Sequence, residues 1–184
     1  MYEKGLNYNQ YNFNGIDSKL EGKYRKGHFN GVATIVSKLF ELFKPNQAFF
    51  GEKDFQQTQI VKRLINLEKH KTKLIICPTV REKNGLAMSS RNNLLSKKNR
   101  ENSSIIFHNL NYVKIHFKKT DFDQIISKCI KSINSYDGFK TEYFEIVDSF
   151  SLSKQKKYCE NKSYRVFVSV IVDEVRLIDN ILLN

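Results

Sequence analysis

The stretch from Ala48 to Gln57 constrains the fold more than any other part of the 184-residue chain. It opens with the apolar run Ala48-Phe49-Phe50, which the breaker pair Pro45-Asn46 precedes, and this pattern predicts a buried strand. Asp54 is suited to cap a following helix, with Gln57 three residues later completing a capping-box pattern. Apolar residues then continue at helical spacing, namely Ile60, Val61, Leu64 and Ile65.

The turn between this strand and this helix carries residues suited to a nucleotide. Open α/β sheets bind nucleotides at the carboxyl end of a strand, beside a helix N-terminus. Gly51 allows a ligand to approach the backbone closely, Lys53 is suited to a phosphate, and Asp54 is suited to ribose hydroxyls. An ordinary strand-to-helix turn with a solvated lysine and a capping aspartate fits the same residues, and the local pattern alone favours that simpler interpretation.

The next segment predicts a second strand beside the first. Lys73-Leu74-Ile75-Ile76-Cys77 is apolar and stops at Pro78. A strand-helix-strand unit of this length implies a parallel pair with a right-handed crossover. A further helix is expected to carry Val32, Val36, Leu39, Phe40 and Phe43 on one face and to stop before Pro45, with Arg25 and His28 just before it. Residues 25–79 therefore fit the second half of a Rossmann-like domain, whereas residues 1–24 show no period and are expected to form a loop.

The loop from Thr79 to Asn92 collects polar and cationic groups. It contains Arg81 and the run Met88-Ser89-Ser90-Arg91. Serine hydroxyls, backbone N–H groups and a guanidinium in one mobile turn suit a polyphosphate tail. The run by itself is a weak signal that a plain polar loop also explains.

Several motifs together resemble the pantoate–β-alanine ligase (pantothenate synthetase) family. The resemblance rests on Gly51 to Gln57 and on the stretch from Pro78 to Asn92. It is supported by Gly27-His28-Phe29-Asn30-Gly31-Val32 and Arg176-Leu177-Ile178-Asp179-Asn180. It extends from Met1-Tyr2 to the C-terminus. The family's N-terminal strand and His-x-Gly-His signature have no counterpart here, so a C-terminal portion of such an enzyme is expected.

The resemblance implies a reaction and a set of site residues. Pantoate would attack the α-phosphate of ATP to give pantoyl adenylate and pyrophosphate, and β-alanine would then displace AMP to give pantothenate. Lys53, Ser89 and Arg91 are the expected catalytic groups, and Gln57 is the expected pantoate ligand. Arg25 and His28 are possible supports of the site, although a lone histidine is more often structural. The expected ATP-binding residues are Gly51, Glu52, Lys53, Asp54, Val80, Met88, Ser89, Ser90 and Arg91.

The resemblance also implies partners. Mg²⁺ is expected to accompany ATP, with no metal site on this chain, and a homodimer is expected. Glu52 belongs to the motif without an assigned role. His70, His108 and His116 match nothing in the family and are expected at the surface.

The remainder of the chain predicts a second domain. Residues 1–79 are expected to form the rest of the nucleotide-binding domain and residues 80–184 a small α+β domain. Its expected helices begin at Ser96 and Asp121, and the second helix is strongly amphipathic. Its expected strands cover 141–147, 164–172 and 175–178, with a tight hairpin at Asp173-Glu174 and a polar loop or short helix over 149–162. The predicted fold class is therefore α/β followed by a small α+β domain with an antiparallel sheet.

Composition excludes some classes of function. The net charge is +12, but lysines and arginines are spread along the chain without a stripe, so neither nucleic acid nor a membrane surface is expected as a partner. The three cysteines, Cys77, Cys129 and Cys159, lack metal-ligand spacing and are expected as free thiols in the cytoplasm. No apolar segment approaches the ~20 residues that a membrane span needs, and the N-terminus lacks a signal-peptide pattern.

Two alternatives stay open beside the ligase. One is a non-catalytic remnant or half of a split enzyme, and the other is a basic nucleic-acid-binding module. Without the family's N-terminal part, this chain alone is not expected to be a competent ligase. The strand at Ala48 to Phe50 and the helix at Val32 to Phe43 are then expected to expose a sheet edge and apolar surface.

Overall fold

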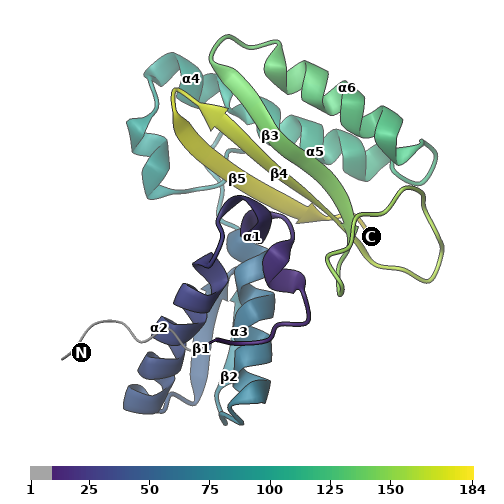
Figure 1. Ribbon diagram of the computed structural model, residues 1–184. Helices are drawn as coiled ribbons and strands as arrows, with labels where there is room; N and C mark the ends of the chain where they lie inside the picture. Colours follow the sequence, from purple (N-terminus) through teal and green to yellow (C-terminus); the bar gives the residue numbers. More distant parts are fainter. Residues whose placement is uncertain (1–9) are drawn as a thin grey trace. The chain divides into compact units, whose positions relative to one another are not determined.

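The computed structural model describes residues 10–184, which form two compact units (Figure 1). The first unit ends at Pro78, and the second covers Thr79–Asn184. Each unit has its own secondary structure and its own buried core. The observed fold confirms the predicted fold class, which is a parallel α/β part followed by an α+β part with an antiparallel sheet.

The first unit is built around a parallel strand pair. Strand β1 (Gln47–Gly51) pairs with β2 (Lys73–Cys77) from Gln47 opposite Lys73 to Gly51 opposite Cys77. The connecting helix is α3 (Phe55–Leu67), preceded by the single 3-10 turn η2 (Glu52–Asp54). The predicted strand-helix-strand unit is therefore confirmed.

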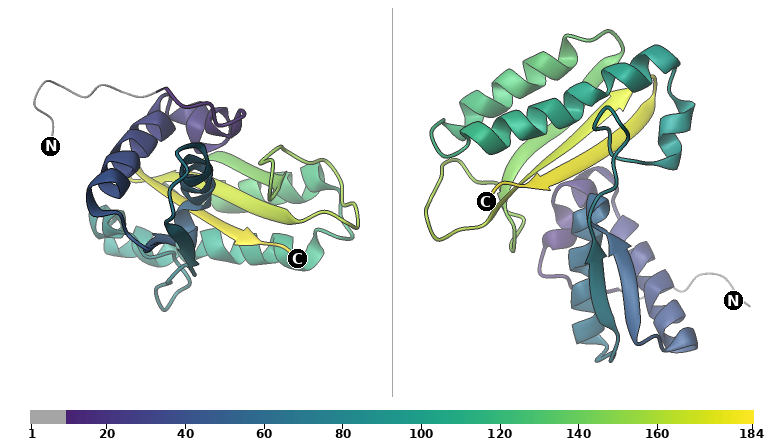
Figure 2. Two further views of the ribbon diagram at one scale, coloured as in Figure 1. Left: turned by 90° about the horizontal axis from the view of Figure 1, so that it is seen from below. Right: turned by 180° about the vertical axis from the view of Figure 1, so that it is seen from behind.

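Both long helices of this unit lie on one face of the two-stranded sheet (Figures 1 and 2). Within residues 10–78 of the first unit, no helix covers the other face. Phe49 in β1 is 65% exposed and Ile76 in β2 is 39% exposed. The prediction of a buried strand at Ala48 to Phe50 is therefore wrong here, because a parallel strand is buried only when elements pack on both faces of its sheet.

Helix α2 (His28–Phe43) begins four residues earlier than its apolar run suggested. Gly27 is the residue before the helix and adopts a left-handed conformation, with φ 77°, which glycine adopts without steric cost. His28 is consequently the first residue of the helix and not part of a preceding turn. The helix ends at Phe43, before Pro45 as predicted, and Leu42 and Phe43 are exposed.

The segment before α2 is ordered structure rather than the expected loop. It contains η1 (Ile16–Ser18) and α1 (Glu21–Tyr24), and Phe13, Ile16 and Leu20 are buried. The sequence shows no period here because the segment is held by contacts to distant residues. The first nine residues, which were also expected to form a loop, lie outside the described part of the chain.

The second unit places helices on one face of an antiparallel sheet. Its helices are η3 (Ser90–Leu94), α4 (Lys97–Asn102), α5 (Ser104–His116) and α6 (Phe122–Asn134). Its strands are β3 (Phe139–Asp148), β4 (Tyr164–Val172) and β5 (Val175–Leu182), in the order β3-β4-β5. The hairpin between β4 and β5 turns at Asp173 and Glu174, with φ 48° and 65°, as the sequence predicted. The stretch between β3 and β4 contains no helix.

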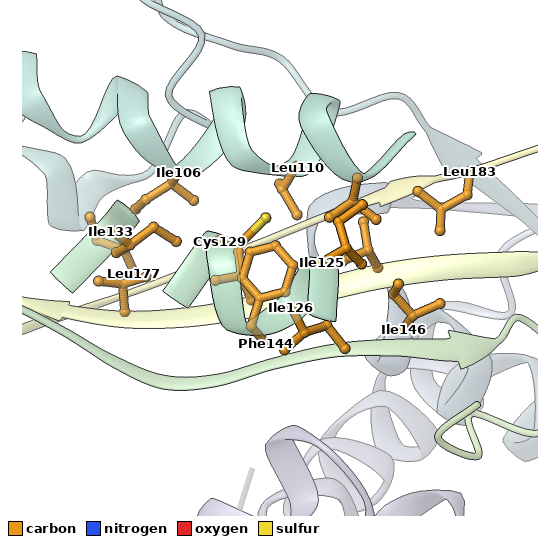
Figure 3. Close-up of a cluster of buried hydrophobic side chains, with 14 of the residues drawn as sticks. Ile106, Leu110, Ile125, Ile126, Cys129, Ile133, Phe144, Ile146, Leu177 and Leu183 are labelled. Carbon is orange, nitrogen blue, oxygen red and sulfur yellow. The ribbon is translucent and has the colours of Figure 1, made fainter. Parts of the chain in front are cut away.

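The core of this unit lies between α5, α6 and the sheet (Figure 3). Asp121 caps α6 through its side chain, which accepts from the backbone N–H groups of Asp123 and Gln124. The apolar stripe of α6 is buried as predicted. The side chains that meet in this core include Ile106, Leu110, Ile125, Cys129, Ile133, Phe144, Ile146 and Leu177.

Candidate functional site

The predicted site residues of the first unit gather at one end of it. Strands β1 and β2 both finish there, and helices α2 and α3 both begin there, because each helix runs antiparallel to the strands (Figures 1 and 2). Gly51 to Asp54, Gln57, Arg25 and His28 therefore share this end. It is the end at which α/β sheets bind ligands.

Gly51 has no structural need to be glycine. Its φ is −73°, which any residue adopts. A Cβ atom built at this position would meet no atom within 4 Å. The space beside the Gly51 backbone is therefore open within the described residues.

Asp54 precedes α3 but does not cap it through its side chain. Its φ and ψ are −98° and 50°, and the side chain makes no capping hydrogen bond, so the predicted capping box with Gln57 is wrong. The 3-10 turn η2 separates the strand from the helix. The Asp54 side chain is 49% exposed, and its Oδ1 lies 3.8 Å from Lys53 Nζ, on a side chain that is 19% exposed.

The two glutamines of the motif have different environments. Gln56 is buried, accepts a hydrogen bond from the backbone N–H of Glu21, and donates to the carbonyls of Ile16 and Lys19. Gln57 is only partly buried and lies in the first turn of α3. Gln56 is thus committed to holding η1 and α1, and Gln57 keeps the position expected of a ligand-binding group.

Arg25 and His28 contact each other at the start of α2. Arg25 Nη1 lies 2.9 Å from His28 Nε2. Because a guanidinium has no acceptor atom, the hydrogen bond runs from Arg25 Nη1 to Nε2 of the His28 ring. The structure therefore pairs the two residues that the sequence singled out together.

In the second unit the predicted residues lie on a small hairpin and the turn that follows it. Met88 donates its backbone N–H to the Val80 carbonyl, and Arg81 and Ala87 form a β-bridge. Val80 and Met88 are 66% and 54% exposed. Ser89 then caps η3, with its Oγ accepting from the backbone N–H of Arg91.

The Arg81 side chain is bonded to other groups of the protein, although the loop pattern suggested a role with phosphates. Its guanidinium makes two hydrogen bonds to Asp179, of 2.6 and 3.1 Å, and a third to the Gly85 carbonyl. It also stacks on Phe107, with Cζ 3.9 Å from the ring centre. In contrast, the Arg91 side chain is exposed and forms no ion pair within residues 10–184.

Four residues that shape this turn had no role expected from the sequence, namely Glu82, Asn92, Arg100 and Asp179. Glu82, Asn92 and Arg100 form a hydrogen-bonded network around Ala87 and η3, and Asp179 pairs with Arg81. The available signal for Glu82, Asn92 and Asp179 was their place inside motif stretches without an obvious ligand role, and Arg100 lies outside those stretches. Their pairing could not be read from the sequence, because 98 positions separate Arg81 from Asp179.

Within the described residues no three His, Cys, Asp or Glu side chains are grouped in a way that could hold a metal ion. All three cysteines are free, as expected. Burial raises the pKa of the Cys129 thiol to about 12, so this cysteine is a core residue and not a nucleophile. No helix among residues 10–184 has the length and apolar character needed to cross a bilayer.

Comparison with known proteins gives one consistent result. The sequence matches the pantoate-beta-alanine ligase family over residues 1–182. It is 41% identical to a pantothenate synthetase of Flavobacterium psychrophilum over 184 residues, which is 100% of this chain and 65% of that protein. It is 42% identical to the pantothenate synthetase of Bacteroides thetaiotaomicron over 179 residues, which covers 94% of this chain and 61% of that protein.

Solved structures agree. The pantothenate synthetase of Thermus thermophilus superimposes with a TM-score of 0.84 at 32% identity, over 91% of this chain and 60% of that one. The pantoate-beta-alanine ligase of Francisella tularensis, complexed with beta-gamma ATP and beta-alanine, superimposes with a TM-score of 0.68 at 33% identity. This match covers 91% of this chain and 55% of that one. The chain thus spans less than two thirds of the length of these relatives.

The parallel pair with its α3 crossover and the separate helix-covered antiparallel sheet define a Rossmann-like α/β protein with an added α+β unit. Within that class, the chain belongs to the pantoate-beta-alanine ligase family.

Proposed function

We propose that this chain carries the nucleotide-binding and pantoate-binding residues of a pantothenate synthetase. The observation that supports this proposal most is the turn after β1. There a glycine without a structural need precedes a half-buried lysine and an aspartate that does not cap the helix. The substrate class follows from the family, in which a relative was solved with an ATP compound and beta-alanine.

The proposed reaction has two substitutions. A pantoate carboxylate oxygen attacks the α-phosphorus of ATP, a P–O bond breaks, and pyrophosphate leaves. The β-alanine amine then attacks the acyl carbon of pantoyl adenylate, the bond to AMP breaks, and the amine loses a proton. The products are pantothenate, AMP and pyrophosphate. Positioning and electrostatic stabilisation account for the rate without a covalent enzyme intermediate.

The first unit holds the proposed groups nearest to the adenylation. Gly51 lets the nucleotide approach the backbone, Lys53 stabilises charge at the α-phosphate, and Asp54 accepts hydrogen bonds from the ribose. Glu52 lies in the same turn, in η2, and is counted with the nucleotide contacts. Gln57 binds pantoate from the first turn of α3.

Other proposed groups support these. In the first unit, Arg25 and His28 support the site from the start of α2. In the second unit, the backbone at Val80 meets adenine, and Met88 with Ser90 covers the phosphates. Ser89 and Arg91 contribute to catalysis there, where the Arg91 guanidinium is exposed to solvent and so is accessible to an anion.

The remaining partners are part of the same proposal. Mg²⁺ would enter with the ATP phosphates, because the described residues offer no metal cluster of their own. The proposal includes a homodimer and a cytoplasmic location, both by family resemblance, and free cysteines are common in a reducing compartment.

Pantoate-dependent exchange of labelled pyrophosphate into ATP tests the function. The purified chain is assayed alone and after addition of a polypeptide that corresponds to the part of the relatives that it does not span. We expect exchange only in the mixture. Exchange by the chain alone would support the function without a second polypeptide. If circular dichroism shows that both polypeptides are folded and neither sample exchanges pyrophosphate, the proposed ligase function is refuted.

A further inference from the structure

The turn that carries Met88 to Arg91 is held by a network of charged and polar side chains. The hairpin before it closes through three backbone hydrogen bonds, from Glu82 to Leu86, Gly85 to Glu82 and Met88 to Val80. Its tip contains Gly85 with φ 92°, where a Cβ would lie 2.6 Å from the Phe107 ring. The positive φ of Gly85 and the close Phe107 ring therefore both restrict the conformation of the hairpin.

Glu82 is the common acceptor of this network. Its Oε2 accepts from Arg100 Nε at 2.9 Å. Its Oε1 accepts from Arg100 Nη2 at 2.9 Å and from Asn92 Nδ2 at 2.7 Å. One carboxylate thus ties the hairpin to helix α4, which carries Arg100, and to η3, which carries Asn92. The fork-shaped contact to the guanidinium adds directional strength to the attraction of opposite charges.

Asn92 transmits this anchoring to the turn. It is 1% exposed, and its Nδ2 donates to both Glu82 and the Ala87 carbonyl, one residue before Met88. Its backbone N–H donates to the Ser89 carbonyl. Its Oδ1 is buried without a hydrogen-bond partner among the described residues. The amide orientation is therefore set by its two N–H groups, since the reverse orientation would place Oδ1 against two acceptors.

A second ion pair fixes the base of the same hairpin. Arg81 bonds to Asp179, which is 4% exposed in β5. The hairpin is consequently tied to α4 through Arg100 and to the sheet through Asp179. Polar networks rigidify a structure where their members are paired, as the Glu82 carboxylate and the Arg81–Asp179 pair are here, whereas Asn92 Oδ1 has no partner among the described residues.

We propose that Glu82 is the positioning residue that holds Met88 to Arg91 as a preformed part of the nucleotide site, instead of a flap that orders only on binding. This inference rests on the proposed function for its ligand. The hydrogen bonds from Arg100 also lower the pKa of Glu82, against the opposing effect of burial, so the carboxylate is ionised at neutral pH. Groups held in place before the ligand arrives lose no conformational freedom on binding, which lowers the concentration of ATP that the site requires.

The central test replaces Glu82 with glutamine, which leaves one acceptor oxygen for three donors. The matched control is Glu101→Gln, which removes the same charge from an exposed position on α4. Amide hydrogen exchange of the whole chain, without ligand, is followed by NMR. We expect the Met88, Arg91 and Asn92 amides to exchange at least about tenfold faster in Glu82→Gln, since one partly buried charged contact is lost. The α6 amides, and all amides of the control, should not change.

Two further variants keep the test decisive if Glu82→Gln folds poorly. Arg100→Lys keeps the positive charge but loses the two-pronged contact, so an intermediate increase in exchange is expected. Asn92→Ala should raise exchange at the same three amides. The double variant Glu82→Gln/Asn92→Ala should exchange more slowly than the two single effects combined would predict, because the two side chains share one hydrogen bond.

Kinetics separate positioning from general stability. In a preparation that shows pyrophosphate exchange, Glu82→Gln should raise KM for ATP at least about fivefold with the KM for pantoate unchanged, because Gln57 lies in the other unit. Unchanged exchange at Met88 to Asn92 would overturn the proposal. An equal increase at all amides of the second unit would also overturn it, because Glu82 would then serve fold stability alone. Faster exchange at this turn with no ATP binding by any preparation would confirm the anchoring and refute the nucleotide role.

Discussion

Gly51 and Gly22 show how differently two glycines of the first unit depend on their surroundings. A Cβ at Gly51 meets nothing within 4 Å, but a Cβ at Gly22 would lie 1.8 Å from the Asp17 carbonyl oxygen. Gly22 is therefore required by the fold, and Gly51 is required, under the proposed function, only by a ligand.

Alanine substitutions at these two glycines should have opposite consequences. Gly22→Ala should lower the free energy of unfolding by about 1–3 kcal/mol or more, because a backbone atom must move. Gly51→Ala should change it by less than about 1 kcal/mol, yet weaken ATP binding roughly tenfold or more through steric exclusion. Denaturant unfolding and calorimetric titration with ATP measure the two effects. Unchanged ATP affinity in Gly51→Ala would contradict the assigned role.

Lys53 should act on the chemical step more than on ATP affinity. Its side chain is 19% exposed beside Asp54, so a phosphate at the turn would meet a partly desolvated cation. Lys53→Ala should lower kcat for pyrophosphate exchange by about a hundredfold or more, the scale of one lost electrostatic donor. Lys62→Ala, an exposed lysine on α3, is the control. A raised KM for ATP with normal kcat would show that Lys53 only binds.

Helix α3 uses successive glutamines for two purposes. Gln56 points to η1 and α1 with three hydrogen bonds, and Gln57 occupies the next position around the helix. A single helical turn thus connects the order of the preceding segment to the proposed pantoate position.

Substitution of the two glutamines should therefore separate stability from binding. Gln56→Ala should lower the free energy of unfolding by about 2–4 kcal/mol, because it leaves buried backbone groups of residues 16–21 unpaired. Gln57→Ala should leave stability within about 0.5 kcal/mol and raise the KM for pantoate without changing ATP affinity. Thermal unfolding and steady-state kinetics distinguish these results. Loss of ATP binding with normal pantoate KM would assign Gln57 to the nucleotide instead.

At the scale of the whole molecule, each unit is stabilised by a buried or partly buried carboxylate that several donors share. In the first unit Glu68 accepts hydrogen bonds from Tyr11, Ser37 and His70, at 2.7–2.9 Å. Burial raises the pKa of Glu68, but the hydrogen bonds from Tyr11, His70 and Ser37 outweigh it and leave the pKa below its ordinary value of 4.5.

This carboxylate should make stability depend on pH in the acid range. Because the folded state lowers the pKa, the stabilisation is fully present above pH 4.5 and is lost as the pH falls through the folded value. Glu68→Gln should cost about 1–3 kcal/mol at pH 7, and its difference from wild type should shrink below pH 4.5. Denaturant unfolding across the range from neutral to acid pH measures this. The control Glu41→Gln removes an exposed charge on α2 and should keep the pH dependence of the wild type. If Glu41→Gln lost as much of that pH dependence as Glu68→Gln does, the prediction would be contradicted.

The uncovered sheet of the first unit should drive self-association. Phe49 is 65% exposed, so Phe49→Lys should leave unfolding nearly unchanged and reduce concentration-dependent association, measured by light scattering. Ile115→Lys, at a 74% exposed position on α5, carries the same charge change and should have a smaller effect. Equal association of the wild type and both variants would show that the exposed sheet face does not mediate self-association.

Much of the molecule follows from local patterns in the sequence. The apolar runs and the breakers Pro45 and Pro78 set β1 and β2, and the spacing in α6 set its buried stripe, because these patterns act through neighbouring residues. The turn at Gly51 to Asp54 was recognisable as a candidate ligand site for the same reason. The set of site residues on the second unit was recognisable only through the family motif.

Tertiary structure decided what depends on residues far apart. The order of residues 10–24 rests on Gln56, about 40 positions away, and the commitment of Arg81 rests on Asp179. The exposure of Phe49 depends on which elements pack against its sheet, and the absent cap at Asp54 depends on the path of η2. Local sequence does not determine such contacts, because a long-range partner is selected only when the whole unit packs.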